Sequence, residues 1–500
     1  MDLLFVGICI GFVIFLYFKN NPMKHDRNFM VKRFFNWFPL GMTYAFLYMG
    51  RYNLSVAKNA FGDLMPKENF GIIFGVGTIV YGLSFLLNGP LVDRFGGKKG
   101  MLVAAVGSAI ANGMMGILTY AFLHGTIKFN ITIAFSALYG FNMFCQSYGA
   151  VSIIKIKAYW FHVRERGIFG AIFGTLISFG AYFAFDWGQA IINASQKDLV
   201  NPTATQSFFR QIFAIDAGTT NATWLVFFIP AGILLGFSFI NLFLLKDTPG
   251  DANLDDFDTH DASSDEMDKT FSMKELLGRV FRSPLMMTIA AIEFTSGVLR
   301  NGIMQWYFIF AHEVPAMKEI FFTRHWGISI AISGMMGGFT AGYLSDKIFQ
   351  SRRAPPAVIM NFVMMVLLVT MLISLYRFPT LVGLCAVLMC FAVIGVHSLM
   401  SGTAAADFGG RKATATASGI VDGFVYLGSG VQSFAIGFLV TKDWSFWPIF
   451  LIPFTVIGFL LSLKIYWELP EATKKYLVNV EKQVIRVKGS GKPFFKRKNT

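Results

Sequence analysis

Two arginines inside long apolar segments are the residues of this chain best suited to chemistry. Arg51 lies within the apolar stretch 38–60 and Arg300 within 284–311. A charge at the centre of a bilayer costs about 2.5–3.5 kcal/mol on insertion scales. The planar guanidinium group can grip a tetrahedral oxyanion through paired hydrogen bonds, whereas lysine offers only a point charge. The two arginines therefore predict a site for phosphate or a phosphate ester.

The two arginines occupy matching positions in an internal repeat. The stretch GPLVDRFGGKK begins at Gly89, and GYLSDKIFQSRR begins at Gly342. Both stretches read G-x-x-x-D-[RK] followed by a basic pair. The two stretches are roughly 250 residues apart, and Arg51 and Arg300 are separated by roughly the same number of residues. Two halves related by an axis along the membrane normal would turn the arginines toward each other across a central cavity.

Helical spacing supplies polar neighbours to both arginines. Tyr48 falls on the stripe of Arg51, and Glu293 and Tyr307 fall on the stripe of Arg300. These side chains predict a polar cavity wall. The alternative is that Arg300 is a structural partner of Glu293, two turns away, in a pair that forms or breaks as the cavity opens.

Two further ionisable residues lie inside apolar segments, which makes each a functional candidate by default. Asp422 lies within 416–440, where it could pair with an arginine, carry a proton or form a structural hydrogen bond to backbone. His397 lies within 381–402, where it could contact a ligand or titrate. A packed histidine with satisfied nitrogens is the alternative.

These residues must be positioned by a helical membrane bundle. The chain has 500 residues, of which 54% are hydrophobic and 14% are charged, against about 25% charged residues in soluble domains. An apolar run at 3–18 lacks the basic start of a signal peptide and predicts an extra N-terminal helix or anchor. Twelve further spans are predicted near 38–60, 69–92, 101–123, 129–157, 168–192, 223–246, 284–311, 326–345, 356–376, 381–402, 416–440 and 447–467.

The charge pattern predicts the orientation and the division of the chain. Basic residues follow the second, fourth, eighth and tenth spans, which places those loops and the C-terminus in the cytoplasm. The stretch 247–268 has nine acidic residues and no Lys or Arg, as expected for a solvated linker. The predicted units are an anchor with a basic linker (1–35), a six-helix half (36–246), an acidic linker (247–282), a second six-helix half (283–467) and a basic tail (468–500).

Composition argues against several classes of function. The net charge of +14 is concentrated in loops and the tail, which favours the positive-inside pattern and anionic lipid headgroups over nucleic acid. The four cysteines match no zinc site or disulfide framework. The spans contain no catalytic motif. We therefore expect that the protein is not an enzyme and that it has neither a cofactor nor a metal site.

Several stretches resemble known families. GPLVDRFGGKK is similar to the signature loop of the major facilitator superfamily, and LRNGIMQW, at 299–306, resembles the L-R-[YN]-G-[VIL]-x-x-W stretch of organophosphate:phosphate antiporters. The resemblance runs from about residue 36 to 468. It implies an all-α major facilitator fold of 12 transmembrane helices in two pseudo-symmetric halves. It also implies that Arg51 and Arg300 hold the phosphoryl group.

The resemblance carries over unevenly to other positions. Gln146 matches a glutamine of the fourth span. Tyr52, Phe85 and Ile177 stand where glycerol-phosphate transporters carry Lys, Lys and His. The arginine pair is thus kept while three polar accessories are replaced. This leaves room for a larger or less polar organic group, or for another oxyanion.

The superfamily's loop residues imply a gating role at the cytoplasmic side. Acidic residues there pair with loop cations and cap neighbouring helices in one state of the cycle. The residues that match are Asp93, Arg94, Lys98, Arg164, Arg166, Asp346 and Lys347.

The sequence thus predicts a monomeric, multi-pass transporter of the inner (plasma) membrane. The resemblance implies exchange of an organic phosphate for inorganic phosphate by rocker-switch alternating access. One alternative is a proton-coupled transporter of another organic anion, with Asp422, Glu293 and His397 carrying the proton. The other is a transporter-like sensor of sugar phosphate.

Overall fold

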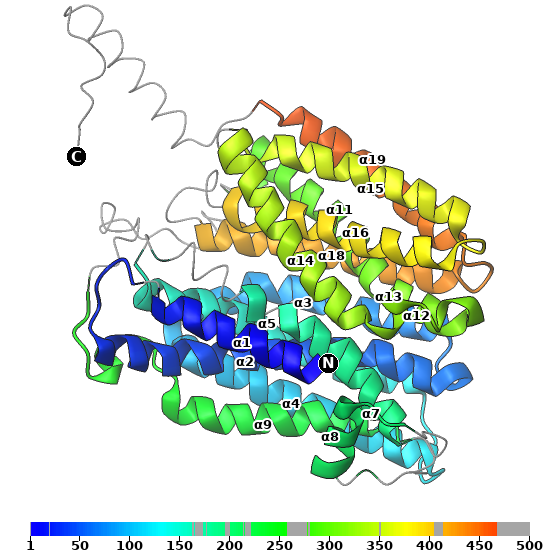
Figure 1. The fold of residues 1–500 in the computed structure, drawn as a ribbon, viewed down its shortest axis with the longest axis horizontal. Coiled ribbons are helices and arrows are strands. Elements are labelled where there is room, and N and C mark those ends of the chain that lie inside the picture. Colours follow the sequence, from blue (N-terminus) through cyan, green and yellow to red (C-terminus); the bar gives the residue numbers. More distant parts are fainter. Residues whose placement is uncertain are drawn as a thin grey trace, which may run out of the picture.

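The protein is all-helical in the part of the chain that the structure, a computed structural model, describes. Figure 1 shows long helices running roughly alongside one another. The described residues are 2–19, 21–162, 165, 174–176, 178–195, 201–213, 215, 222–257, 278, 281–349, 352–404 and 414–467.

Long helices make up most of the described chain, and shorter elements extend or join them. The long helices are α1 (Asp2–Lys19), α2 (Arg27–Phe61), α3 (Lys67–Phe95), α4 (Gly97–Leu123), α5 (Ile131–Trp160), α9 (Leu225–Leu244), α11 (Pro284–Met304), α14 (Trp326–Tyr343), α15 (Ala354–Ser374), α16 (Pro379–His397), α18 (Thr414–Leu439) and α19 (Phe446–Lys464). The short elements are η1 (Gly62–Leu64), η3 (Phe183–Trp187), α7 (Gly188–Ala194), α8 (Ala204–Ile212), η4 (Gly250–Ala252), α12 (Trp306–Glu313), η6 (Pro315–Met317), α13 (Phe321–Arg324), η7 (Leu344–Ile348) and η8 (Ser398–Ala404).

Several predicted spans differ from the helices at their ends. Helix α2 begins at Arg27, well before the predicted 38, because the Asp26 side chain accepts a hydrogen bond from Phe29 N and caps the helix. The predicted span 284–311 is divided at Gln305 into α11 and α12. By length and composition, six described helices can cross a membrane, so the number of twelve spans stays a prediction.

The outer surface of the bundle is apolar, as a membrane requires. Ile133, Phe239 and Ile373 are each about 70% exposed, with values of 69%, 67% and 70%. Such side chains are unfavourable in water but suit contact with lipid hydrocarbon. The four cysteines are free thiols, and three of them are buried. Both observations agree with the expected membrane bundle.

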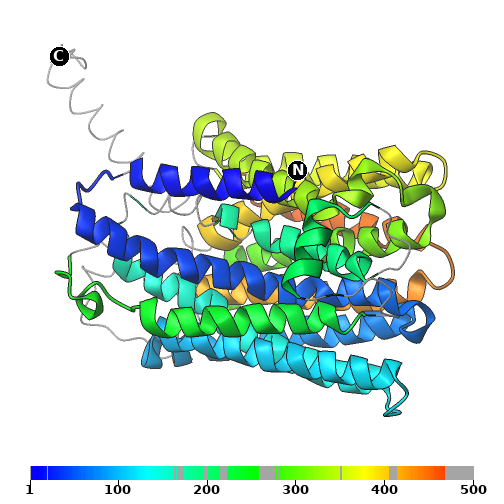
Figure 2. The same ribbon diagram turned by 60° about the horizontal axis from the view of Figure 1, so that its bottom comes forward.

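The helices form two groups, which we call the N-terminal group (α2–α9) and the C-terminal group (α11–α19). Figures 1 and 2 show the groups side by side, with α1 along the N-terminal group. On α1, Tyr17 donates its hydroxyl hydrogen to Met30 O at 2.9 Å. The predicted boundaries at 36–246 and 283–467 stay predictions.

The two groups approach closely where α3 crosses α18. A Cβ atom built on Gly71 would lie 2.5 Å from Ser433 O, and one built on Gly437 would lie 3.0 Å from the Gly71 Cα. Farther along the same helices, a Cβ on Gly82 would lie 2.8 Å from the backbone oxygen of Gly423. Glycine at these positions lets the two backbones touch, which is how membrane helices commonly pack.

Adding one methyl group at this crossing should therefore destabilise the protein. We expect Gly71→Ala to cost about 1–3 kcal/mol, because overpacking forces the backbones apart. The matched control is Gly113→Ala in α4, where a Cβ meets nothing within 4 Å and where Ala should gain about 0.5–1 kcal/mol. Thermal unfolding in detergent tests this prediction, since a melting point of Gly71→Ala at or above that of the wild type would contradict it.

Candidate binding site

A cavity of about 770 Å³ lies between the two groups of helices. Tyrosines of α2 line one side, and residues of α11, α14, α16 and α18 line the other. Among the described lining residues, those that are charged or titratable, tyrosines aside, are Arg300, His397 and Asp422, all from the C-terminal group. The cavity therefore has one polar wall, which determines what it can bind.

Arg300 presents a guanidinium group to this cavity. The residue is 8% exposed, and its guanidinium carbon lies 5.4 Å from the ring centroid of Tyr426. Its Nε has no hydrogen-bond partner among the described residues. A buried donor without a partner costs about 1–3 kcal/mol or more when charged. Arg300 thus brings a positive charge and a donor without a described partner to the cavity.

Arg51 is held differently, although the repeat makes it the twin of Arg300. It is 1% exposed and does not line the cavity. Its Nε donates to Gln146 Oε1 at 3.0 Å, its Nη1 to the Tyr426 hydroxyl at 3.1 Å and its Nη2 to the Tyr81 hydroxyl at 3.1 Å. We call Gln146, Tyr81 and Tyr426 the Arg51 enclosure.

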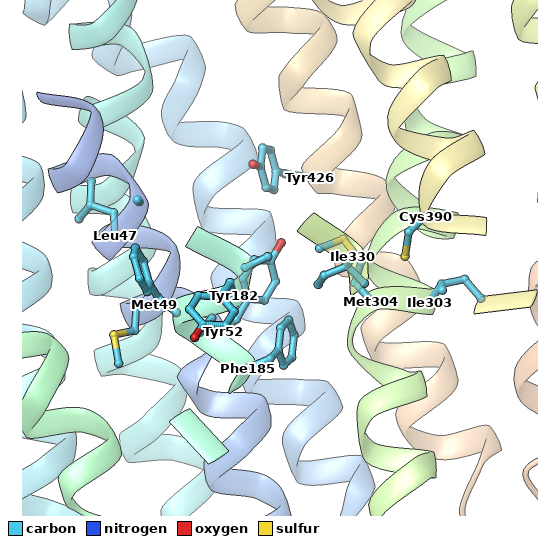
Figure 3. Close-up of a cluster of buried hydrophobic side chains, with 14 of the residues drawn as sticks. Leu47, Met49, Tyr52, Tyr182, Phe185, Ile303, Met304, Ile330, Cys390 and Tyr426 are labelled. Carbon is cyan, nitrogen blue, oxygen red and sulfur yellow. The ribbon is translucent and has the colours of Figure 1, made fainter. Parts of the chain in front are cut away.

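The expectation that the two arginines face each other across an open cavity is therefore wrong for this state. Tyr426 contacts both of them, since its hydroxyl binds Arg51 and its ring lies beside Arg300. Figure 3 shows Tyr426 reaching from its own helix toward the N-terminal group. The enclosure tyrosines were not singled out by sequence analysis, although Tyr426 lies one helical turn from Asp422 and so shares its face.

Two predicted tyrosines of α2 do line the cavity. Tyr48 places its ring 4.6 Å from the guanidinium carbon of Arg51, a cation–π contact. Tyr52 donates its hydroxyl hydrogen to Asn301 Oδ1 at 3.2 Å, which links the two groups of helices. Figure 3 shows Tyr52 on the side of the cluster opposite Met304.

Two other predicted site residues do not reach the cavity. Tyr307 hydrogen-bonds Thr323 at 3.2 Å, and its ring lies 4.3 Å from that of Trp326. Tyr307 lies two helical turns beyond Arg300, and the described cavity lining along this stretch ends at Met304. Gln146 lies behind Arg51 and positions its guanidinium group.

The predicted acidic residues have partners within the C-terminal group. Glu293 is fully buried, and its Oε2 lies 2.8 Å from His397 Nδ1. Asp422 lines the cavity and accepts a hydrogen bond from the Ser401 hydroxyl. Among the described residues, the side-chain partner of Glu293 is His397, so the alternative of a structural pair with Arg300 is not what the structure contains.

The predicted gating residues remain predictions. Arg94 and Lys347 are exposed, and the Lys98 backbone N–H donates to Asp247 Oδ1 at 2.8 Å. Asp93 lies in α3 and Asp346 in η7. Arg164 and Arg166 lie outside the described residues.

A buried ion pair occupies the loop end of α5, next to these positions. Arg33 donates from Nη1 to Glu165 Oε2 and from Nη2 to Glu165 Oε1, both at 3.0 Å, and from Nε to Tyr17 at 3.0 Å. Burial raises the pKa of Glu165, but hydrogen bonds with His25 and Arg33 outweigh it and lower this pKa to about 2. The pair ties α1, α2 and the loop after α5 together.

The opposite end of the bundle, where α2 ends and α14 begins, is closed by contacts between the two groups. The Asp186 carboxylate, in η3, accepts hydrogen bonds from Gly327 N at 2.7 Å and Ile328 N at 3.0 Å. These are free N–H groups in the first turn of α14, where a negative charge also meets the helix dipole favourably. We call this end the closed end.

A charged cluster adds to the closed end. Glu313 of α12 forms ion pairs with Lys58 of α2 at 3.4 Å and with Lys67 of α3 at 2.9 Å. Lys67 also lies 4.6 Å from the Trp444 ring centroid. The cavity lining runs away from this end, along α14 from Ile330 as far as Tyr343. The described part of the cavity therefore extends away from the closed end.

Comparisons with known proteins give one family and a consistent set of relatives. The sequence profile of the Major Facilitator Superfamily matches residues 40–433. The chain is 22% identical to the membrane sensor protein UhpC of Salmonella typhimurium, over 83% of this chain and 88% of that one. It is 24% identical to the glycerol-3-phosphate transporter of Bacillus subtilis (85% and 90%) and 24% identical to a probable hexose phosphate transport protein of Chlamydia trachomatis (87% and 91%). These relatives are membrane transporters and a sensor rather than enzymes, as expected.

Solved structures confirm the fold. A bacterial homolog of the human lysosomal transporter Spinster superposes with a TM-score of 0.64 at 13% identity, over 86% of this chain and 97% of that one. The nucleoside transporter NupG superposes with a TM-score of 0.56 at 13% identity, over 86% and 98%.

The Arg33–Glu165 pair should matter for stability. We expect Glu165→Gln to cost about 3–5 kcal/mol, because it leaves Arg33 charged and buried without its partner. Because the folded pKa of Glu165 is below its ordinary 4.5, this stabilisation is present above about pH 4.5 and is lost as the pH falls toward 2. Thermal unfolding measures it. Glu319→Gln, in an exposed ion pair with Arg324, should change stability by under about 1 kcal/mol, and equal effects of the two changes would refute the prediction.

The Asp186 contact should hold the closed end shut. Asp186→Ala removes the carboxylate that accepts two hydrogen bonds from the other group of helices. We therefore expect this variant to populate states that are open at this end. Spin labels on the exposed residues Leu64 and Phe321 would then show an added population at longer distance. Asp63→Ala removes an exposed acid nearby and serves as the control. An unchanged distance distribution in Asp186→Ala would rule out this role.

Proposed function

The chain belongs to the Major Facilitator Superfamily, and from this premise we propose that it exchanges an organic phosphate for inorganic phosphate. The observation that carries the proposal is Arg300, whose guanidinium group borders a cavity between the two groups of helices and keeps a donor without a partner. A phosphoryl group offers the negative oxygens that such a donor needs. The names of the glycerol-phosphate and hexose-phosphate relatives support this class of substrate.

Arg51 supplies the second positive charge of the proposed site. In the present state its donors are occupied by the Arg51 enclosure, and Tyr426 separates it from Arg300. Tyrosine hydroxyls are neutral acceptors, and a phosphate oxygen forms hydrogen bonds with guanidinium that are roughly twice as strong. A bound phosphoryl group would therefore displace Tyr426 and bring the two groups of helices together around the ligand.

Transport then follows from alternating access. The closed end is held by Asp186, Glu313 and the α3–α18 crossing, while the cavity extends toward the other end. The positive-inside pattern makes that other end cytoplasmic, so this state is the inward-open one. Because exchange needs a ligand to draw the groups together, the empty carrier would rarely reorient.

The organic part of the substrate would lie against an apolar wall. Phe85, Met335 and Phe339 line the cavity beyond Arg300. Phe85 stands where the glycerol-phosphate carriers have Lys, which favours a larger or less polar organic group. We place the protein in the inner (plasma) membrane as a monomer with a cytoplasmic C-terminus.

A sugar-phosphate sensor is the second candidate. The sequence identity to the UhpC sensor is 22%, which is close to the 24% identity to the transporters. Binding without flux in the experiment below would favour the sensor.

The test is exchange of labelled phosphate by proteoliposomes loaded with phosphate and offered a panel of phosphate esters. We expect exchange by the wild type and at least a tenfold loss in Arg300→Ala, since each charged hydrogen bond contributes about 1.5–3 kcal/mol. Arg377→Ala, at an exposed position, is the matched control. Absence of exchange by folded wild-type protein with phosphate and every ester, or full activity of Arg300→Ala, would refute the proposal.

A further inference from the structure

A histidine and a carboxylate form a titratable pair at the polar wall of the cavity. His397 lines the cavity and is 26% exposed, whereas Glu293 behind it is fully buried. The 2.8 Å contact joins His397 Nδ1 to Glu293 Oε2, which leaves Nε2 as the ring nitrogen that can accept a proton. Glu293 Oε1 has no hydrogen-bond partner among the described residues.

The pair lies among other charged groups that the phosphate site uses. Arg300 is on α11 with Glu293, two turns further along. From α18, Asp422 and Tyr426 face the same cavity, and α14 contributes Tyr343 as its titratable lining residue. With both carboxylates ionised and His397 neutral, the charges of Glu293 and Asp422 cancel those of Arg51 and Arg300.

This balance is unfavourable for a doubly charged ligand. A phosphate dianion would bring two negative charges into a cavity whose fixed charges already sum to zero, in surroundings that screen charge poorly. One added proton on the Glu293–His397 pair would neutralise the negative charge of that pair. The added proton would also remove the cost of a buried, ionised carboxylate that has one oxygen without a hydrogen-bond partner.

We propose that the Glu293–His397 pair binds one proton when a phosphate dianion occupies the cavity and releases it when the anion leaves. The proposal rests on the proposed phosphate site. The proton comes from cavity water, enters at His397 Nε2, and is shared between the ring and the Glu293 carboxylate, so that the pair changes from one negative charge to none. No other bond is made or broken.

Two features favour a proton site over a structural pair. A structural pair would gain from complete burial and full hydrogen bonding, yet the histidine faces the cavity and one carboxylate oxygen is orphaned. The helix also changes to the π-helical η8 directly after His397, and such irregular turns occur often at functional sites. By linkage, phosphate affinity should rise as the pH falls through the range in which the pair titrates.

The experiment measures proton uptake on binding of inorganic phosphate by the purified full-length protein. Calorimetry in buffers of different ionisation enthalpy gives the number of protons taken up per phosphate. The wild type should take up about one more proton than Glu293→Gln and than His397→Gln, between pH 6 and 8. Phosphate's own titration is common to all variants and cancels in this difference. His124→Gln, an exposed histidine in a loop, is the matched control and should behave as the wild type.

An infrared titration of the ligand-free protein keeps the test independent of phosphate binding. The C=O stretching band of a protonated carboxylic acid should appear as the pH falls, and Glu293→Gln should abolish it. Phosphate should strengthen this band in the wild type and in His124→Gln. The proton site would be overturned, with exchange left intact, by two results together. Phosphate would bind with equal proton uptake in the wild type and in both pair variants, and no band would be assigned to Glu293. If phosphate does not bind at all, the proposed function fails, and a band that Glu293→Gln leaves unchanged then overturns this inference as well.

Discussion

A guanidinium group inside an apolar helical bundle must have its donors satisfied, and much of this structure follows from that requirement. Arg33 meets it with the carboxylate of Glu165 and with the hydroxyl of Tyr17. Arg51 meets it with the neutral oxygens of its enclosure. Arg300 meets it only in part, and it is the one of these three that borders the cavity. A buried guanidinium group with one donor that no described residue binds is suited to an anion-binding site.

The partners of these arginines also differ in what they connect. Arg33 and Glu165 join elements of the N-terminal group, with a paired charge that stabilises a fixed arrangement. Tyr426 joins Arg51 across the two groups through a hydrogen bond between a charge and a neutral oxygen, which a phosphate could replace. The strong pair thus stays within one rigid body, while the exchangeable bond lies at the interface that must open and close. At the closed end, Asp186 and Glu313 provide further contacts between the two groups, through the first N–H groups of α14 and through Lys58 and Lys67.

The sequence was sufficient for the fold class, whereas the binding roles of the two arginines stay predictions. Apolar segments and the repeat around Gly89 and Gly342 indicate a two-part helical bundle, and a charge inside an apolar segment singles out Arg51 and Arg300. It was insufficient for the partners, because these come from helices that meet only in three dimensions. Tyr426 reaches Arg51 from α18, which glycines let cross α3 closely, and Tyr81 reaches it from α3 itself. Tyr307 shares the stripe of Arg300 but lies two turns farther along, where its hydroxyl meets Thr323 instead of the cavity. Helical spacing predicted Glu293 on the stripe of Arg300, whereas His397, which contacts Glu293 from another helix, could not be predicted as its partner from spacing.

The proposed site requires that one phosphoryl group contacts both arginines between the two groups of helices. Solid-state NMR can measure this directly, through dipolar coupling between phosphate ³¹P and ¹⁵N-labelled arginine side chains in lipid bilayers, with signals assigned by Arg51→Lys and Arg300→Lys. We expect coupling from phosphorus to two guanidinium groups, one of which is lost in each variant. Coupling to only one of Arg51 and Arg300, or to neither, in protein shown to retain phosphate, would contradict this site.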